Sequence, residues 1–127
     1  MKWTLKIAGA YNILWGTWVG LFPSHFFELV GMEPLNHEVV WQGMGMVIGV
    51  YGLGYWWAGQ DPMRHWPIVA VGFLGKIFGP LGFIFNYLQG NIPAGFGYTM
   101  ITNDLIWWVP FALILVKANK TQNIKWI

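Results

Sequence analysis

Four apolar stretches of about 20 residues each dominate this chain of 127 residues. A helix of that length is needed to cross the hydrocarbon core of a lipid bilayer. Hydrophobic residues make up 56% of the chain and charged residues only 9%, which is too little charge for the surface of a soluble domain. We therefore expect residues 1–127 to form a single, all-α integral membrane domain. The predicted spans cover residues 5–22, 39–59, 66–88 and 98–116.

Helix-ending residues separate the four stretches. A proline follows each of the first three, at Pro23, Pro62 and Pro93. The segment after the first stretch begins at Ser24, an N-cap candidate, and ends at Gly31, a typical C-terminal stop. Its apolar residues fall on one face, which predicts a short helix lying in the membrane interface. The expected fold is thus a four-helix transmembrane bundle with a short interfacial helix between spans one and two.

Basic residues are confined to one side of this predicted topology. With four spans, the N-terminus, the second loop and the C-terminus share a side. That side holds Lys2, Lys6, Arg64, Lys117, Lys120 and Lys125. The opposite side has no Lys or Arg and carries Glu28, Glu33 and Glu38. Because Lys and Arg in short loops stay in the cytoplasm, we expect both termini to be cytoplasmic and the protein to lie in a bacterial inner membrane.

Glycines four residues apart occur in three of the four stretches. The pairs are Gly16/Gly20, Gly45/Gly49 and Gly75/Gly79. Small residues at this spacing let helix backbones approach closely in lipid. We interpret the pairs as packing sites within the bundle, with a homodimer interface as the alternative. Pro80 and Pro110 are expected to kink the third and fourth spans and to free backbone carbonyls near their centres.

One lysine, Lys76, lies in the middle of the third stretch, between two of these glycines. A charge near the bilayer centre costs a few kcal/mol unless it is paired or neutralised. Asp104 is the only acidic residue inside a predicted span, so we expect the two to form an ion pair. Further hydrogen-bond partners are expected at Asn103, Asn12 and Gln42. Such a pair is either a structural device inside the bundle or a site that binds a polar head or relays protons.

Aromatic residues accompany these polar groups. Trp107 lies one turn from Asp104, and Phe83 shares a helix face with Lys76 and Asn86. Aromatic side chains at such positions either pack in the core or wall a cavity for a flat lipophilic molecule. The candidate ligand-binding residues are therefore Lys76, Asp104, Asn103, Trp107, Asn12, Gln42, Phe83 and Asn86.

The absence of cysteine excludes several kinds of chemistry at once. Without a thiol, the chain has no route to thiol peroxidase activity, disulfide exchange or an iron–sulfur cluster held by its own residues. His25, His37 and His65 lie in or beside predicted loops and lack the spacing of a ligand set, so no metal site is expected. No set of catalytic residues emerges from the sequence.

The first span contains Trp15-Gly16, a proline-bounded interfacial segment follows, and the second span opens with Trp-Gln-Gly-Met-Gly at residues 41–45. Together with a short turn and a glycine-rich third span, this order resembles the DoxX-like group of small four-span bacterial membrane proteins. The resemblance implies a four-helix fold and a membrane partner of quinone-linked oxidoreductases, with a quinone as the candidate ligand. Residues 65–69, 75–80 and 103–108 also resemble small membrane proteins labelled alkyl hydroperoxide reductase, a label that without cysteine cannot mean the thiol mechanism.

Three functions remain open. The first is binding of a quinone-like lipophilic small molecule, or service as an accessory membrane subunit of an oxidoreductase. The second is a structural role in a larger membrane complex, and the third is proton-coupled transport. The expected partners are the lipid bilayer and either other membrane subunits or a second copy of the chain, with no nucleic acid.

Overall fold

The computed structural model describes all residues from 1 to 127 and contains helices but no β-strand. The expected all-α class is therefore confirmed, as is a short helix between the first two long ones. The elements in chain order are α1 (Lys2–Leu21), α2 (His25–Val30), α3 (Glu38–Ala58), α4 (Trp66–Leu88), the 3₁₀ turn η1 (Ala94–Phe96), α5 (Gly97–Met100), the π-helical segment η2 (Ile101–Leu105) and α6 (Ile106–Gln122).

Two helical segments are long and apolar enough to cross a membrane. They are α4 and the continuous run Ala94–Gln122, which joins η1, α5, η2 and α6. Helices α1 and α3 match them in length, with 20 and 21 residues. Their tryptophans, tyrosines and glycines lower the mean hydropathy, because indole and phenol rings are amphipathic. The first three predicted stretches coincide with α1, α3 and α4, and the fourth helical run extends beyond its prediction at both ends.

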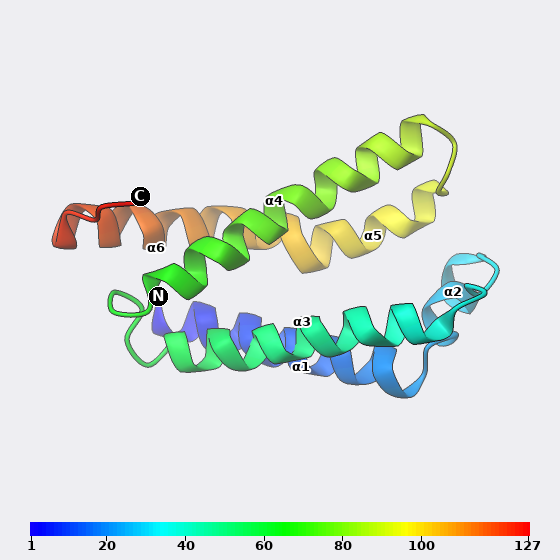
Figure 1. The fold of residues 1–127 in the computed structure, drawn as a ribbon, viewed down its shortest axis with the longest axis horizontal. Helices are drawn as coiled ribbons and strands as arrows, with labels where there is room; N and C mark the ends of the chain where they lie inside the picture. Colours follow the sequence, from blue (N-terminus) through cyan, green and yellow to red (C-terminus); the bar gives the residue numbers. More distant parts are fainter.

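The long helices form two pairs (Figure 1). Helix α1 packs along α3 over its whole length, and α4 crosses the run Ala94–Gln122. Helix α4 begins beside α3 and diverges from it toward the end of the molecule that carries α2 (Figure 1). At that end the two pairs are joined by Phe96 of η1, whose ring centre lies 6.3 Å from that of Trp41.

Glycines bring α1 and α3 into backbone contact. A Cβ atom on Gly9 would lie 2.6 Å from the carbonyl oxygen of Gly52, and one on Gly16 would lie 2.8 Å from the backbone nitrogen of Gly49. Neither position can hold a side chain without moving a helix. The packing interpretation therefore holds for this pair of helices, although Gly20 has no neighbour within 4 Å and contributes nothing to the contact.

The glycines of α4 behave differently. A Cβ atom on Gly79 would lie 2.7 Å from a carboxylate oxygen of Asp104, and one on Gly75 would meet nothing within 4 Å. The Gly75/Gly79 pair is thus not a helix–helix packing site, contrary to the prediction. Gly72 instead lies against the phenol ring of Tyr55, a contact that any side chain at residue 72 would obstruct.

Pro80 frees a carbonyl in α4, as predicted. In an unbroken helix, the carbonyl of Lys76 would accept a hydrogen bond from the backbone N–H of residue 80, which proline lacks. The indole Nε1 of Trp108 donates to this carbonyl at 2.8 Å instead. One polar contact therefore ties α6 to the middle of α4, at the residue that carries the buried ammonium.

The segment η2 widens the helical run where α5 meets α6. A π-helical turn holds more residues than an α-helical turn, so it shifts the side chains before it relative to those after it. Two carbonyls here accept hydrogen bonds from side chains: Thr102 from Trp107 Nε1 at 3.0 Å, and Asn103 from Lys76 Nζ. This local geometry turns the backbone carbonyl of Asn103 and the carboxylate of Asp104 toward α4.

Two apolar clusters hold the helices together. The larger one joins both helix pairs near the end that carries the termini and consists of Leu5, Ala8, Tyr55, Ala58, Val69, Trp107, Phe111 and Ile114. The smaller one packs α2 against α1 and α3 and consists of Trp15, Val19, Phe26, Phe27 and Trp41. Between the two clusters, a cavity separates the two helix pairs.

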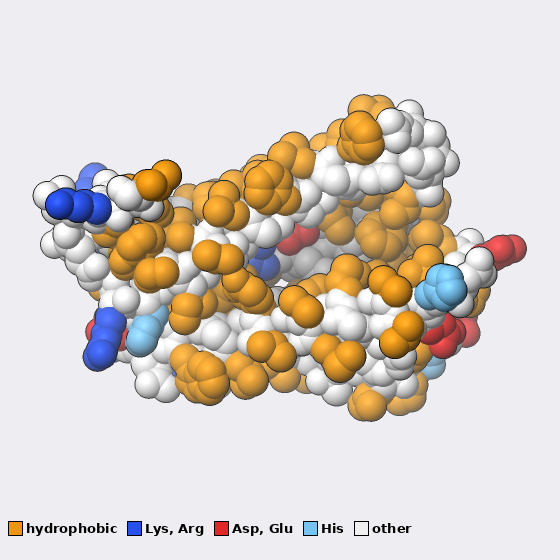
Figure 2. All heavy atoms as spheres, viewed as in Figure 1, with side chains coloured by type: hydrophobic (Ala, Val, Ile, Leu, Met, Phe, Trp, Pro, Cys, Tyr) orange, Lys and Arg blue, Asp and Glu red, His pale blue; other side chains and the backbone are white.

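Charged side chains gather at the two ends of the molecule (Figure 2). The termini and the turn between α3 and α4 carry the basic residues, and in that turn the backbone N–H of Arg64 donates to the carboxylate of Asp61 at 3.2 Å. The end with α2 carries Glu28, Glu33 and Glu38. Apolar side chains cover most of the surface between these ends (Figure 2).

Candidate functional site

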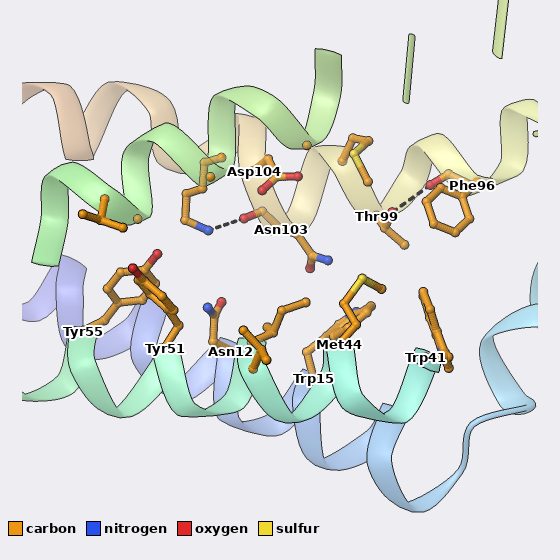
Figure 3. A pocket seen from close by; sticks show the side chains of 18 residues that line it. Asn12, Trp15, Trp41, Met44, Tyr51, Tyr55, Phe96, Thr99, Asn103 and Asp104 are labelled. Carbon is orange, nitrogen blue, oxygen red and sulfur yellow. Dashed lines mark hydrogen bonds between the residues drawn. The ribbon is translucent and has the colours of Figure 1, made fainter. Parts of the chain in front are cut away.

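A cavity of about 500 Å³ lies between the two helix pairs. Its volume is within the range of small-molecule sites in proteins. Its walls come from α1, α3, α4 and the run from η1 to η2 (Figure 3). The lining residues are Asn12, Trp15, Trp41, Met44, Val47, Ile48, Tyr51, Tyr55, Val71, Gly72, Gly75, Lys76, Gly79, Phe96, Thr99, Met100, Asn103 and Asp104.

One face of α3 supplies the longest wall of the cavity. Trp41, Met44, Ile48, Tyr51 and Tyr55 follow one another at intervals of three and four residues, so they form a single stripe along the helix. This stripe lies beside the glycine face of α3, which packs on α1. The glycine face is not available to the cavity, because it is in close backbone contact with α1.

The ammonium of Lys76 is held by a carbonyl and by aromatic rings. Lys76 is only 5% exposed, and its Nζ donates to the backbone oxygen of Asn103 at 2.5 Å. Nζ also lies 5.7 Å from the ring centres of Tyr55 and Phe111 and 6.0 Å from that of Trp107. The negative faces of aromatic rings attract a cation at such distances. These contacts replace the ion pair expected from the sequence.

Asp104 does not form a direct ion pair with Lys76, so that prediction was wrong. Its carboxylate rests against the backbone of α4 at Gly79 and lines the cavity. No side chain or backbone group of the protein donates a hydrogen bond to it. The π-helical segment explains the difference, because it presents the carbonyl of Asn103 to the ammonium and directs the next side chain along α4.

Two asparagines also face the cavity. Asn12 is 6% exposed, its amide points into the cavity, and it has no hydrogen-bond partner in the protein (Figure 3). Asn103 accepts a hydrogen bond from the hydroxyl of Tyr11 through its side-chain oxygen, which leaves its amide N–H groups free for another partner. The indole Nε1 of Trp41 is the one side-chain polar atom that is fully buried without a hydrogen-bond partner. The free amide groups of Asn12 and Asn103 instead remain accessible from the cavity, where they can bind a partner.

Four of the eight predicted site residues come together in this cavity: Lys76, Asp104, Asn103 and Asn12. Trp107 lies behind Lys76, in the larger apolar cluster. Gln42 is turned away, and its Nε2 donates to the carbonyl of Gly20 at 2.9 Å across the contact between α1 and α3.

The remaining two predicted residues lie toward the far end of α4. Phe83 stacks on Tyr87 with ring centres 5.8 Å apart and lies against Gly97 at the start of α5. Asn86 donates to the carbonyl of Gly82 at 2.9 Å within its own helix. Neither lines the cavity, because it ends at Gly79 along this helix.

Sequence reasoning missed most of the aromatic wall. Trp41, Tyr51 and Tyr55 line the cavity but are not among the eight residues predicted for the site. The spacing of three and four residues from Trp41 to Tyr55 is a signal that identifies this stripe. Phe96 and Thr99 carry no comparable signal, since the 3₁₀ turn η1 and the four-residue helix α5 position them.

The histidines lie outside the cavity. The ring of His25 stacks on Phe22 with centres 4.8 Å apart, and Trp18 Nε1 donates to its Nδ1 at 3.4 Å. No group of three or more His, Cys, Asp or Glu side chains is arranged to hold a metal ion.

Comparisons with protein-family models, with curated proteins and with solved structures found no match for this chain. Its function is therefore inferred from the cavity and the groups that line it. An apolar and aromatic wall with a few polar groups at one place is the usual composition of a site for a small organic molecule. The cavity has this composition, and its polar groups come from all of its walls.

Proposed function

We propose that this protein crosses a bacterial inner membrane four times and binds a lipophilic small molecule in the cavity between its two helix pairs. The molecule has an apolar body, which lies along the aromatic stripe of α3, and a polar head, which lies near Lys76 and Asp104. The observation that carries the proposal is a group of unsatisfied polar side chains at the bottom of an otherwise apolar cavity.

Three features support four membrane crossings. Helices α1 and α3 are as long as a bilayer-spanning helix needs to be, and they run beside α4 and the run Ala94–Gln122. The basic residues all lie at one end except for Lys76, which is buried between the helices. The surface between the two ends is largely apolar (Figure 2). Retention of basic residues on the inner side then directs both termini to the cytoplasm.

The polar groups support binding over simple scaffolding. A buried charge kept only for packing would have its partners within the protein, as charges inside membranes generally do. Lys76 has a carbonyl and three rings, whereas Asp104 and Asn12 have no hydrogen-bond partner. A bound head group would satisfy both residues. A quinone-like molecule is one candidate, in agreement with the DoxX-like layout, and the protein would then serve a membrane oxidoreductase as its binding subunit.

Two glycines of α4 provide a matched test. A Cβ atom would meet nothing within 4 Å at either Gly75 or Gly82, but only Gly75 lines the cavity. We expect Gly75→Leu to fill the cavity and Gly82→Leu to leave it open. Each protein is purified in mild detergent, and the extracted lipophiles are identified by mass spectrometry.

The expected result is a lipophile that is retained in about equal amounts by the original protein and by Gly82→Leu, and that is lost from Gly75→Leu. If all three preparations carry the same molecules in the same amounts, the cavity is not a binding site. A Gly75→Leu protein that has lost its folded structure, as judged by circular dichroism, is replaced by Gly75→Val, which adds less volume.

A further inference from the structure

The cavity carries two opposite charges that do not neutralise each other directly. Lys76 and Asp104 both line it, yet the ammonium is bonded to the carbonyl of Asn103 and the carboxylate accepts no hydrogen bond. A molecule entering the cavity therefore meets the ammonium of Lys76, which already donates one hydrogen bond, and the carboxylate of Asp104, which accepts none. The sum of the two charges is zero, so the site as a whole offers no counter-charge to an ionic head.

A charged head group fits this arrangement poorly. An anionic head would be attracted by Lys76 and repelled by Asp104, and a cationic head would meet the reverse. An ion would also lose its hydration on entering a largely apolar cavity, which is costly without a dedicated partner. An uncharged head avoids both costs. Its attraction to the site then depends on hydrogen bonds alone.

The unsatisfied groups define what the head must offer. The carboxylate of Asp104 is an acceptor and needs a donor from the ligand, such as a hydroxyl. The amides of Asn12 and Asn103 present N–H groups that need an acceptor, and a hydroxyl oxygen provides one. Asn12 is 6% exposed and its amide points into the cavity, so a molecule in the cavity can reach it (Figure 3). One hydroxyl on an apolar body can bond to both kinds of group.

The opening of the cavity indicates where such a molecule comes from. Figure 2 shows a hollow between α3 and α4 with a basic and an acidic side chain at its bottom. The rim is formed by Met44 and Val47 of α3 and Val71 of α4, which are exposed apolar side chains. If these helices span the membrane, as proposed above, the rim faces the acyl chains of the bilayer. At the end near α2, the rings of Phe96 and Trp41 lie with their centres 6.3 Å apart and their planes tilted by 60°, and both line the cavity.

We infer that the cavity selects an uncharged lipophile whose head carries a hydroxyl group, and that this molecule enters sideways from the bilayer between α3 and α4. This inference rests on the proposed function and narrows its ligand class. Among quinone-like molecules it favours the hydroxyl-bearing quinol over the quinone, because a quinone has no donor for Asp104.

Four probes with one common chain test the head group. Oleyl alcohol has an uncharged donor and acceptor, its methyl ether has an acceptor only, oleate is an anion and oleylamine is a cation. Each radiolabelled probe is titrated onto the purified protein in detergent, with Gly82→Leu and Gly75→Leu as positive and negative controls. Because a hydrogen bond to a charged group contributes about 2 kcal/mol, we expect the ether to bind at least about tenfold more weakly than the alcohol. Oleate and oleylamine are also expected to bind more weakly than the alcohol.

A variant of the acceptor links this preference to the site. Asp104→Asn keeps the shape of the side chain and removes its charge, so the difference between alcohol and ether is expected to shrink to about threefold or less. Equal binding of alcohol and ether by the original protein, or tightest binding of oleate, would overturn the inference and leave the proposed function intact. Equal binding of the alcohol by Gly75→Leu and Gly82→Leu would overturn the proposed function itself.

The route of entry has its own measurement. Val47→Trp adds bulk at the rim outside the aromatic stripe of α3, and is expected to slow oleyl alcohol association by about tenfold while changing equilibrium affinity less. A matched substitution at the exposed residue Met46, which is not part of the rim, should leave the rate unchanged. Equal association rates for Val47→Trp and Met46→Trp would overturn lateral entry.

Discussion

Between α1 and α3, Gly9, Gly16 and Gly52 face backbone, whereas the glycines along α4 face a ring, a carboxylate or open space. The same residue type therefore closes one interface and keeps the other open. In the first helix pair, Gly9, Gly16 and Gly52 remove all space between two helices. In α4, Gly79 makes room for the carboxylate of Asp104, and Gly75 leaves part of the cavity unfilled. Two glycines four residues apart show that other atoms can approach a helix closely there. They do not show whether those atoms belong to a helix backbone, a side chain or a ligand.

The largest expected effect breaks the closed interface. Gly16→Ala places a methyl group 2.8 Å from the backbone nitrogen of Gly49 and 2.9 Å from its Cα atom. Since backbone cannot rotate away as a side chain can, we expect a loss of about 3 kcal/mol in the free energy of unfolding. Gly20→Ala in the same helix is the control, because a Cβ atom there meets nothing within 4 Å. Unfolding of both variants in mixed micelles, followed by circular dichroism, makes the comparison.

Equal stability of Gly16→Ala and Gly20→Ala would show that α1 and α3 can separate without cost. The close contact would then not be what fixes the first helix pair.

The next effect tests whether Lys76 in the cavity binds a ligand or only stabilises the fold. Lys76→Met keeps the length of the side chain and its contact with the rings of Tyr55, Trp107 and Phe111, but removes the ammonium. We expect retention of the bound lipophile to fall about tenfold, with the free energy of unfolding changing by only about 1 kcal/mol. Mass spectrometry and unfolding in mixed micelles measure the two quantities.

Lys6→Met is the control for this variant, because Lys6 also lies over aromatic rings but sits outside the cavity. A large loss of stability in Lys76→Met, with retention of the lipophile unchanged, would assign the lysine a structural role.

The helices were predictable from the sequence, and so were the polar groups at their centre. Apolar runs bounded by proline gave α1, α3 and α4, and the rarity of charge inside them marked Lys76 and Asp104. The hydrogen-bond partners were not predictable. A regular period of 3.6 residues places Asn103, Asp104, Trp107 and Phe111 on one face, whereas the π-helical segment places the first two at the cavity and the last two behind Lys76.

The aromatic stripe of α3 was missed for a different reason. Small and polar residues are the usual marks of a packed helix face in membrane bundles, and this stripe consists of large side chains instead. In α3, however, two faces are inward: one of glycines against α1, and one of aromatic residues at the cavity. Because the molecule consists of two helix pairs, α3 has one buried face toward α1 and a second buried face toward the other pair.

The smallest expected effect concerns the bond between α4 and α6. Trp108→Phe removes the indole N–H that donates to the carbonyl of Lys76, at a cost of about 1 kcal/mol in the free energy of unfolding. Pro80→Ala returns a backbone N–H to the same carbonyl, so it should make the indole donor dispensable. We therefore expect Trp108→Phe to cost clearly less in the Pro80→Ala background than in the original protein. A double-mutant cycle of unfolding free energies measures this coupling. If the two substitutions had additive effects on the free energy of unfolding, Pro80 would not be the reason why the Lys76 carbonyl accepts from the indole. Helices α4 and α6 would then be joined by apolar packing alone.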